Sequence, residues 1–408
     1  MFESRLGDQK GSKATILNAL RVHGPMPRID LTEVTGLSRA TISTAIAELI
    51  ESNLVRETET RQYTGGRPAI ALELTPHSRV ILGASLDNQA WTLGAFDLLG
   101  NVVKSAKIPI LDASPETAVQ TLSDHIADFI DMDCGIIPLL GLGTPGLVDT
   151  RSGVIRSASD LGWSNVEIGK MVSEKLGWQT VVVNRHRARG LAECRYGSGR
   201  KYNQLIYIGV GTGVAAGLFI DRQLIPGAIG GAGEVGHITV DPDGPLCPCG
   251  NNGCLQLLCA GPAIEKHARM LLRSGEPSSL YTDPDYDLQL LKAEDVCKAA
   301  DEGDELAVKV IVQAATYLGI AMANLVNLFN PEVIILGGSI PRKCDIYVQS
   351  AIKVMRQRAM IPLSASTEVV TASLIEIGDA LGAANFALDN HMAFLLLDQS
   401  SLPGLKRA

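Results

Sequence analysis

The sequence lacks three features that would each place it in a familiar class of protein. It has no excess of positive charge, because 36 Lys and Arg residues stand against 44 Asp and Glu residues, for a formal net charge of −8. A chain coated with positive charge for nucleic acid is therefore excluded, and any contact with DNA must be local. It also lacks both the unbroken apolar run of about 18 residues typical of a membrane helix and an apolar leader at its start. We therefore expect no membrane span and a cytoplasmic location.

The third missing feature is a disulfide framework. The chain has eight cysteines in 408 residues, and cysteines in a long cytoplasmic chain are expected to be free thiols or metal ligands. Cys247, Cys249 and Cys254 lie close together, which is the spacing of metal ligands.

The hydrophobic content of 46% and the charged content of 20% provide enough apolar side chains for two or three packed domains.

The first domain, which we place at residues 1–78, has the pattern of a winged helix-turn-helix. Residues 13–24 and 28–36 read as amphipathic helices, and Ser38 is a suitable N-cap for a third helix from Arg39 to about Ser52. Residues 54–75 form two alternating runs joined by a Gly-Gly turn, as in a hairpin wing. Residues 1–75 carry nine basic and nine acidic residues, so this segment is electrically balanced.

The third helix of this domain is the candidate DNA-reading element. Its apolar positions, Ile42, Ile46, Leu49 and Ile50, are expected on its inner face. Short polar side chains and an arginine near the N-terminus of a helix suit contact with base edges in the major groove, and an arginine in a wing suits a minor groove or a phosphate. The candidate DNA contacts are therefore Arg39, Thr41, Ser43, Thr44 and Arg67.

The remainder of the chain has the pattern of an α/β protein with two similar lobes. Residues 80–110 read as three consecutive strands, 116–130 as a helix and 139–149 as a strand that enters a glycine turn. Residues 204–224 and 307–339 repeat this theme of strands, glycine turns and a helix. We expect a first lobe at residues 79–184, completed by 375–408, and a second lobe at 185–374, with a cleft between them.

Several spaced motifs in this order resemble the ROK family (repressors, open reading frames, kinases). The resemblance covers nearly the whole chain and includes the winged helix-turn-helix of the repressor branch. It implies an actin-like, hexokinase-like two-lobed fold, a sugar in the cleft and assembly into a homodimer or homotetramer. The motifs are Gly209-Val210-Gly211-Thr212-Gly213, Glu234-Val235-Gly236-His237, Cys247-Pro248-Cys249-Gly250-Asn251-Asn252-Gly253-Cys254 and the segment from Asn330 to Gly338.

His237 and the three clustered cysteines predict one structural zinc ion per chain. One imidazole and three thiolates form a closed set of four ligands that leaves no position for a catalytic water. The resemblance places Glu234 and His237 at the hydroxyl groups of the sugar. The zinc is therefore expected to hold the ligand-binding loop in place and not to act as a Lewis acid.

Two departures from the kinases of this family argue against phosphoryl transfer. The first phosphate loop, Gly-x-Asp-x-Gly-Gly-Thr in the kinases, corresponds here to Gly83 to Gln89, with Ser85 in place of its aspartate and Asp87-Asn88-Gln89 in place of Gly-Gly-Thr. The position of the catalytic base, directly after Asn184, carries Arg185. A guanidinium cannot accept a proton at physiological pH, so general-base catalysis is lost at this position.

The same position raises the question of what the site binds. Val181 to Val183 read as a buried strand that leads directly into a helix, and ligands bind at the carboxyl ends of such strands. Arg185 can bind a carboxylate or phosphate, or it can pair with an acidic neighbour, so an acidic ligand, a neutral sugar and no ligand all remain open. His186, Arg187 and Arg189 are expected on the solvent face of the helix. The candidate ligand residues are Asp160, Asn184, Arg185, Glu234, His237 and Gln256, with Asp160 and Gln256 standing where the family has asparagine and glutamate.

The sequence therefore predicts a non-enzymatic transcriptional regulator, most simply a repressor of carbohydrate-related genes. It is expected to bind double-stranded operator DNA and to respond to a small sugar or sugar derivative in the cleft. The alternative is an ATP-dependent sugar kinase with a fused DNA-binding domain. The retained glycines at 209–213 and 337–338 are compatible with nucleotide binding and equally with turns that the fold requires. A third interpretation is a DNA-binding architectural protein without an effector.

Overall fold

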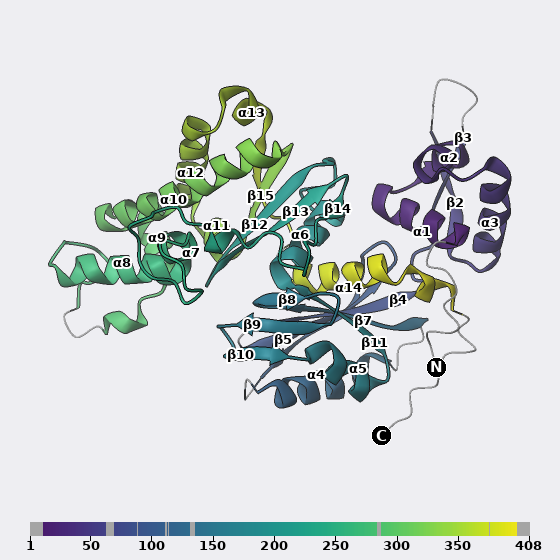
Figure 1. Ribbon diagram of the computed structural model, residues 1–408, viewed down its shortest axis with the longest axis horizontal. Coiled ribbons are helices and arrows are strands. Elements are labelled where there is room, and N and C mark those ends of the chain that lie inside the picture. Colours follow the sequence, from purple (N-terminus) through teal and green to yellow (C-terminus); the bar gives the residue numbers. More distant parts are fainter. Residues whose placement is uncertain are drawn as a thin grey trace. The chain divides into compact units, whose positions relative to one another are not determined.

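The computed structural model describes residues 11–62, 69–87, 89–110, 112, 114–130, 135–283, 287–374 and 376–397. The chain forms two compact units (Figure 1). Unit 1 comprises residues 1–192 together with 376–408, and unit 2 comprises residues 193–375. The C-terminal segment thus returns to the first unit.

Unit 1 begins with a three-helix domain and a small sheet. Helix α2 ends at Gly36, whose φ of 69° is a left-handed conformation that glycine adopts without steric cost. The side chain of Ser38 then accepts a hydrogen bond from the backbone N–H of Thr41 at 3.1 Å and caps α3 as expected. The strands pair in the order β1-β3-β2. The elements are α1 (Ser12–His23), β1 (Met26–Pro27), α2 (Arg28–Thr35), α3 (Arg39–Glu51), β2 (Val55–Gln62) and β3 (Ala69–Leu74).

The larger part of unit 1 is built on a five-stranded sheet of order β11-β7-β4-β5-β6. Strands β4, β5 and β6 form an antiparallel meander, whereas β4, β7 and β11 run parallel to one another, so their carboxyl ends share one edge of the sheet. The register pairs Thr144 with Asn184 at that edge. The strands are β4 (Val80–Leu86), β5 (Ala90–Asp97), β6 (Val102–Pro109), β7 (Ile136–Thr144) and β11 (Gln179–Asn184).

Helices cover both faces of this sheet. Helix α14 lies along one face, and α4 and α5 lie on the other (Figure 1). Glycines let α14 approach closely, because a Cβ on Gly83 or Gly141 would collide with backbone oxygens of α14. A second small sheet has the order β10-β9-β8. The remaining elements are α4 (Pro115–Ile130), β8 (Leu147–Asp149), β9 (Val154–Ala158), β10 (Trp163–Val166), α5 (Ile168–Leu176), α6 (Arg185–Tyr196), α14 (Gly378–Asn390) and η3 (Met392–Leu396).

Unit 2 contains a second five-stranded sheet, of order β14-β13-β12-β15-β16, with helices packed around it. Strand β12 is antiparallel to β13 and parallel to β15, which is parallel to β16. The strands are β12 (Leu205–Val210), β13 (Val214–Ile220), β14 (Gln223–Leu224), β15 (Val333–Gly337) and β16 (Glu368–Thr371). The helices are η1 (Val235–His237), α7 (Gln256–Cys259), α8 (Gly261–Arg273), η2 (Leu288–Leu290), α9 (Ala293–Asp301), α10 (Glu305–Phe329), α11 (Ser339–Lys343), α12 (Asp345–Arg358) and α13 (Ile361–Ser366).

Within the described parts of the chain, α10 alone is long and apolar enough to cross a membrane. Its apolar window is 61% buried inside unit 2, where α10 packs against α8, α9 and α12. Residues such as Ile311, Leu318 and Met322 are fully buried there. The apolar character of α10 is accounted for by its place in the core of unit 2.

The fold confirms the expected class: an N-terminal winged helix-turn-helix precedes an α/β body in two parts. The expected meander of residues 80–110 is β4, β5 and β6, and the expected helix of 116–130 is α4. The expected boundaries at residues 78, 184 and 374 remain predictions. The two units of the structure meet at residues 192 and 375 of the chain.

Candidate functional site

Asn184 lies at the carboxyl end of β11 and is 3% exposed. Its side-chain oxygen accepts hydrogen bonds from the backbone N–H groups of His186, at 2.9 Å, and Arg187, at 3.3 Å. Its amide nitrogen donates to the backbone oxygen of Gly146 at 2.9 Å. Asn184 therefore caps the start of α6 and ties it to the turn after β7.

Arg185, the first residue of α6, lies beside Asp160. The nearest guanidinium nitrogen is 3.8 Å from a carboxylate oxygen of Asp160, and the two side chains are 17% and 38% exposed. This distance is that of an ion pair and is too long for a direct hydrogen bond. Arg185 therefore pairs with an acidic neighbour of unit 1, Asp160. The pair leaves guanidinium N–H groups able to donate to a third group.

The first loop that differs from the kinase pattern lies at the same edge of the sheet. Ser85 of β4 pairs in register with Gly143 of β7, and a Cβ on Gly143 would lie 3.3 Å from the Ser85 hydroxyl and 3.6 Å from the Cα of Arg185. The structure thus brings Ser85 close to Asn184 and Arg185. Gly143 has no side chain to separate them.

The turn after β4 is closed by Asp87. One carboxylate oxygen of Asp87 accepts from the backbone N–H groups of Gln89, at 2.8 Å, and Ala90, at 2.7 Å. Asp87 places a negative charge in the loop where the family resemblance puts the phosphates of ATP. In the structure it also occupies the N–H groups that a phosphate-binding turn would present. The side chain of Asp87 forms an Asx turn three residues before β5 begins at Ala90. Asn88 lies outside the described residues.

The expectation that His186, Arg187 and Arg189 lie in solvent is wrong. Arg187 is 1% exposed, and the guanidinium of Arg189 donates to the carboxylate of Asp379 on α14. Burial, followed by the charge of Arg185, lowers the pKa of His186 to about 3, so this ring is neutral at physiological pH. Helix α14, from the far end of the chain, packs against α6 and supplies the partner of Arg189, a contact that the local sequence pattern does not reveal.

Among the retained glycines of unit 2, Gly337 and Gly338 have a packing role. A Cβ on Gly337 would collide with the side chain of Tyr207, and one on Gly338 would collide with the backbone oxygen of Val210. Gly338 also has a φ of 95°. The turn at 211–213 closes with a hydrogen bond from the N–H of Gly211 to the oxygen of Gly213 at 3.0 Å. The fold therefore needs Gly337 and Gly338 whether or not a nucleotide binds, whereas a Cβ on Gly211 or Gly213 would make only ordinary contacts, at 3.5 Å and 3.6 Å.

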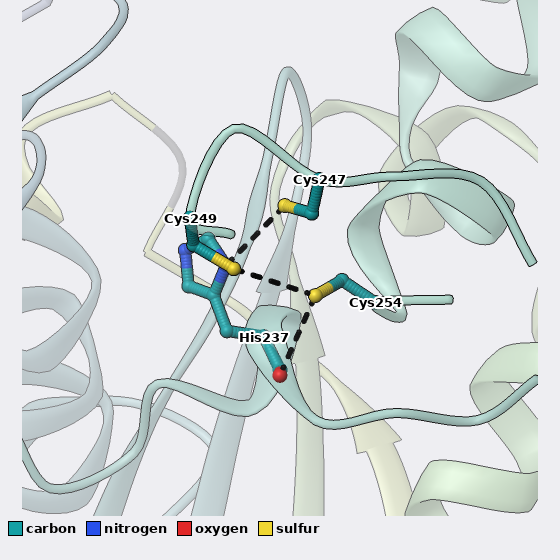
Figure 2. Close-up of side chains that lie close together, drawn as sticks. All are labelled: His237, Cys247, Cys249 and Cys254. Carbon is teal, nitrogen blue, oxygen red and sulfur yellow. Dashed lines mark hydrogen bonds between the residues drawn. The ribbon is translucent and has the colours of Figure 1, made fainter. Parts of the chain in front are cut away.

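His237 and the three cysteines come together in unit 2, as Figure 2 shows. The four ligand atoms all lie within 4.8 Å of one another, with Cys247 Sγ 3.7 Å from His237 Nδ1 and Cys249 Sγ 3.6 Å from Cys254 Sγ. A tetrahedral zinc ion with Zn–S bonds of about 2.3 Å holds its sulfur ligands about 3.8 Å apart. The four side chains therefore fit a metal of zinc size and preference.

The pKa values of Cys249 and Cys254 in this cluster shift in opposite directions. Cys249 is exposed, and its pKa is lowered to about 7, mainly because its sulfur accepts a hydrogen bond from the backbone N–H of Asn251. Burial raises the pKa of Cys254 to about 12. A bound cation removes the proton from such a buried thiol because it stabilises the thiolate.

The backbone around the cluster holds the loop in a closed shape. The backbone N–H of Cys247 donates to the backbone oxygen of Asn251 at 2.7 Å. Gly253 has a φ of 61°, and a Cβ at this position would collide with the backbone of Asp241. The amide of Gln256 lies 3.8 Å from Cys247 Sγ and can donate to it. Glu234 directly precedes η1, which carries His237, and accepts from the His237 backbone N–H at 3.1 Å. The metal cluster and Glu234 thus share one short segment.

The candidate ligand residues fall into two groups, one in each unit. Unit 1 brings Asp160, Asn184 and Arg185 together, and unit 2 brings Glu234, His237 and Gln256 together. His237 Nδ1 faces the cysteines, so its Nε2 is the nitrogen with which this ring can contact a ligand.

In the N-terminal domain, the expected DNA-contacting side chains of α3 are all exposed: Arg39, Thr41, Ser43 and Thr44. The hydroxyl of Thr41 lies 2.8 Å from that of Ser38, so it takes part in the helix cap. Ile42, Ile46 and Leu49 are buried as expected, but the placement of Ile50 on the inner face is wrong, because its side chain is 38% exposed near the end of the helix. Arg67 and the wing turn lie outside the described residues.

Comparisons with known proteins agree with both parts of this architecture. A model of the MarR family matches residues 10–64, and a model of the ROK family matches residues 81–390. A helix-turn-helix domain joined to a body of the sugar-kinase type is the class of protein that the fold defines. The chain belongs to the ROK family.

Proteins that are similar to this chain over more than nine tenths of its length include transcriptional regulators. The chain is 30% identical over 380 residues to the DNA-binding transcriptional dual regulator NagC of Escherichia coli, covering 92% of this chain and 91% of that protein. It is 28% identical over 389 residues to the xylose repressor of Caldicellulosiruptor bescii, covering 94% and 96% of the two chains.

Solved structures include both regulators and kinases. A ROK family transcriptional regulator, described as a homologue of the E. coli MLC protein, superimposes with a TM-score of 0.79 at 30% identity and covers 94% of this chain and 98% of its own. A ROK family glucokinase from Streptomyces griseus, in complex with glucose and AMPPNP, has a TM-score of 0.66 at 25% identity. It covers 76% of this chain and 99% of its own.

Proposed function

We propose that this protein is a cytoplasmic DNA-binding transcriptional regulator of carbohydrate-related genes, controlled by a small sugar-like effector. The observation that carries the proposal is the combination of a helix-turn-helix with an exposed polar α3 and a ROK body with Arg185 directly after Asn184. The body keeps the fold of a sugar-binding protein. Its catalytic position carries a side chain that cannot act as a base.

Two features of unit 1 argue against the kinase alternative. Arg185 occupies the position where the family resemblance places the general base, and losing such a base typically slows a reaction by about 10²- to 10⁴-fold. Asp87 satisfies the N–H groups of Gln89 and Ala90 and adds a negative charge where the family resemblance places phosphates. The two changes act on different steps, proton removal and phosphate binding, so neither compensates for the other.

The proposed DNA contacts are made by the exposed N-terminal part of α3. Its first turns present one arginine and three hydroxyl side chains, which are donors and acceptors suited to base edges in a major groove. We propose that Arg67 contributes from the wing. A homodimer, or a homotetramer built from such dimers, would read two half-sites about 34–36 Å apart on double-stranded operator DNA.

The proposed effector residues are Asp160, Asn184 and Arg185 of unit 1 and Glu234, His237 and Gln256 of unit 2. The open contact between Arg185 and Asp160, 3.8 Å apart, leaves the guanidinium able to form a charge-assisted hydrogen bond with a ligand. We therefore propose a sugar derivative with a carboxylate or phosphate group as the preferred effector.

We also propose that His237, Cys247, Cys249 and Cys254 hold one zinc ion. Zinc bound by this closed set would be structural, fixing the segment that carries Glu234 and His237. The separations of the ligand atoms, close to those of a tetrahedral site, support this proposal.

The function is tested by two assays on the same full-length protein. DNA duplexes are selected from a random pool and their affinities are measured by fluorescence anisotropy, with and without a panel of neutral, amino, acidic and phosphorylated sugars. ADP release from MgATP is measured with the same panel. We expect sequence-specific binding that one sugar class changes, and no ADP release. Turnover near 1 per second, typical of working enzymes, would contradict the proposal.

A further inference from the structure

Helix α14 is held on the sheet of unit 1 along its length. A Cβ on Gly83 would meet the backbone of Ala380, and a Cβ on Gly141 would meet that of Ala383. On its other side, Gly382 packs against the backbone of Ala188 in α6 with no space for a side chain. With strands and α6 in direct backbone contact, α14 cannot shift without moving its neighbours, because packed interiors do not deform continuously.

The N-terminal end of α14 is tied to α6. The carboxylate of Asp379 accepts a hydrogen bond from the guanidinium of Arg189, and the two side chains are 23% and 15% exposed. Arg189 lies one helical turn after Arg185, the first residue of α6. A displacement at the start of α6 therefore acts on the Arg189–Asp379 pair.

The C-terminal end of α14 is tied to the DNA-binding domain. Arg21 of α1 is buried, with a side chain 1% exposed, and it forms an ion pair with Asp389. It also donates to the side-chain oxygen of Asn385 at 2.9 Å and to that of Asn18 at 3.1 Å. Asn385 and Asp389 are one turn apart on α14, so both face α1. The first helix of the DNA-binding domain is thus anchored to the helix that contacts α6.

We propose that two positioning residues couple α6 to the DNA-binding domain through α14. Asp379 lies at the N-terminal end of α14, and Arg21 of α1 binds its C-terminal end. The two carboxylates, Asp379 and Asp389, are ten residues apart, which is about 15 Å along a helix. A ligand that changes the position of Arg185 and α6 changes the Arg189–Asp379 pair, and α14 passes this change to Arg21 and α1. The regulatory part of this inference rests on the proposed function, whereas the mechanical part does not.

The test is amide hydrogen exchange on the full-length protein, read at the backbone of α1. Asp379→Asn removes one charge at the far end of α14 and touches no atom of the DNA-binding domain. We expect exchange in α1 to become faster by about fivefold or more, the lower range of typical coupling between sites. Asp379→Glu keeps the carboxylate and is expected to restore most of the protection.

The matched control is Asp149→Asn. Asp149 forms an ion pair with Arg156 at 2.8 Å in the small sheet of unit 1, and neither residue belongs to α6, α14 or α1. We expect exchange in α1 to be unchanged in this variant. Protection of β4 and β7 reports whether each variant keeps its fold. If Asp379→Asn unfolds the unit, Arg189→Lys is the alternative variant for this test. It keeps the positive charge but loses the planar guanidinium that donates to Asp379.

Three outcomes decide the proposal. Faster exchange in α1 with Asp379→Asn or Arg189→Lys, but not with Asp149→Asn, supports it. An unchanged α1 in these variants, with faster exchange only in Asp389→Asn, overturns it, because Arg21 would then be a local anchor. Equal effects of Asp379→Asn and Asp149→Asn also overturn it. A failure of the wild-type protein to bind selected DNA would reject the proposed function while leaving the exchange result decisive.

Discussion

At the scale of single residues, side-chain chemistry at Arg185 and Asp87 determines what the body can do. Arg185 is a permanent donor where the kinase resemblance expects an acceptor, and Asp87 fills its own turn with hydrogen bonds to two backbone N–H groups. Both changes are the basis of our proposal that the body binds a ligand without transferring a phosphoryl group. The nearby ion pair with Asp160 shows how the protein accommodates the added positive charge.

The charge of Arg185 predicts a specific change in ligand preference. In Arg185→Asp, we expect binding of an acidic sugar to be lost through repulsion between like charges, and binding of a neutral hexose to improve because an acceptor stands next to Asn184. Kinase activity should not return, because Asp87 still closes the first loop. Isothermal calorimetry with both ligand classes measures the preference. Tight binding of neutral sugar by the wild type, unchanged in the variant, would show that Arg185 does not contact the ligand.

The cysteine cluster predicts the effect of losing one metal ligand. Cys249→Ser should reduce bound zinc well below one ion per chain and increase hydrogen exchange between residues 238 and 255, because three remaining ligands leave the ion under-coordinated. Cys259→Ala, which removes a buried thiol outside the cluster, should keep the zinc. Elemental analysis checks both variants. Native protein without zinc, or a Cys249→Ser variant with a full complement, would refute the assignment.

At the scale of elements, the sequence predicts best where the determinants are local. The Ser38 cap, the exposed polar residues of α3 and the cysteine cluster each depend on residues near one another in the chain, and all three are found as expected. The pairing of Arg189 depends on Asp379 of α14, 190 residues away, and local periodicity cannot indicate such a contact. Local periodicity also does not indicate that Arg187 is buried. The departure at Asp87 from the kinase loop is evident from the sequence, but its hydrogen bonds to the N–H groups of Gln89 and Ala90 depend on the path of the backbone.

The exposed N-terminus of α3 predicts how DNA affinity changes. Arg39→Ala should weaken binding to the selected duplex by roughly 1–3 kcal/mol and relax the preference at one base pair, as expected when an arginine that reads a guanine is lost. Arg156→Ala removes one positive charge from the small sheet of unit 1 and should leave the affinity nearly unchanged. Anisotropy titrations at a fixed salt concentration compare the two. An equal loss in both variants would mean that Arg39 contributes only its charge.

At the scale of the whole molecule, a balanced DNA-binding domain is joined to an acidic body. The net charge of −8 resides outside residues 1–75, which carry equal numbers of basic and acidic residues. We therefore expect affinity for DNA to come from specific contacts and not from overall attraction. In the proposed dimer, an effector acts by changing the spacing of the two recognition helices.

The most direct test of the central claim is the affinity of the full-length protein for its selected duplex compared with a scrambled duplex, with and without the sugar panel. The account predicts at least roughly 10³-fold tighter binding to the selected sequence, which is the usual lower range for specific regulators. It also predicts that one class of sugar shifts this affinity while the scrambled duplex is unaffected. Equal affinity for both duplexes, or no response to any sugar in the panel, would contradict a regulator controlled by a sugar-like effector.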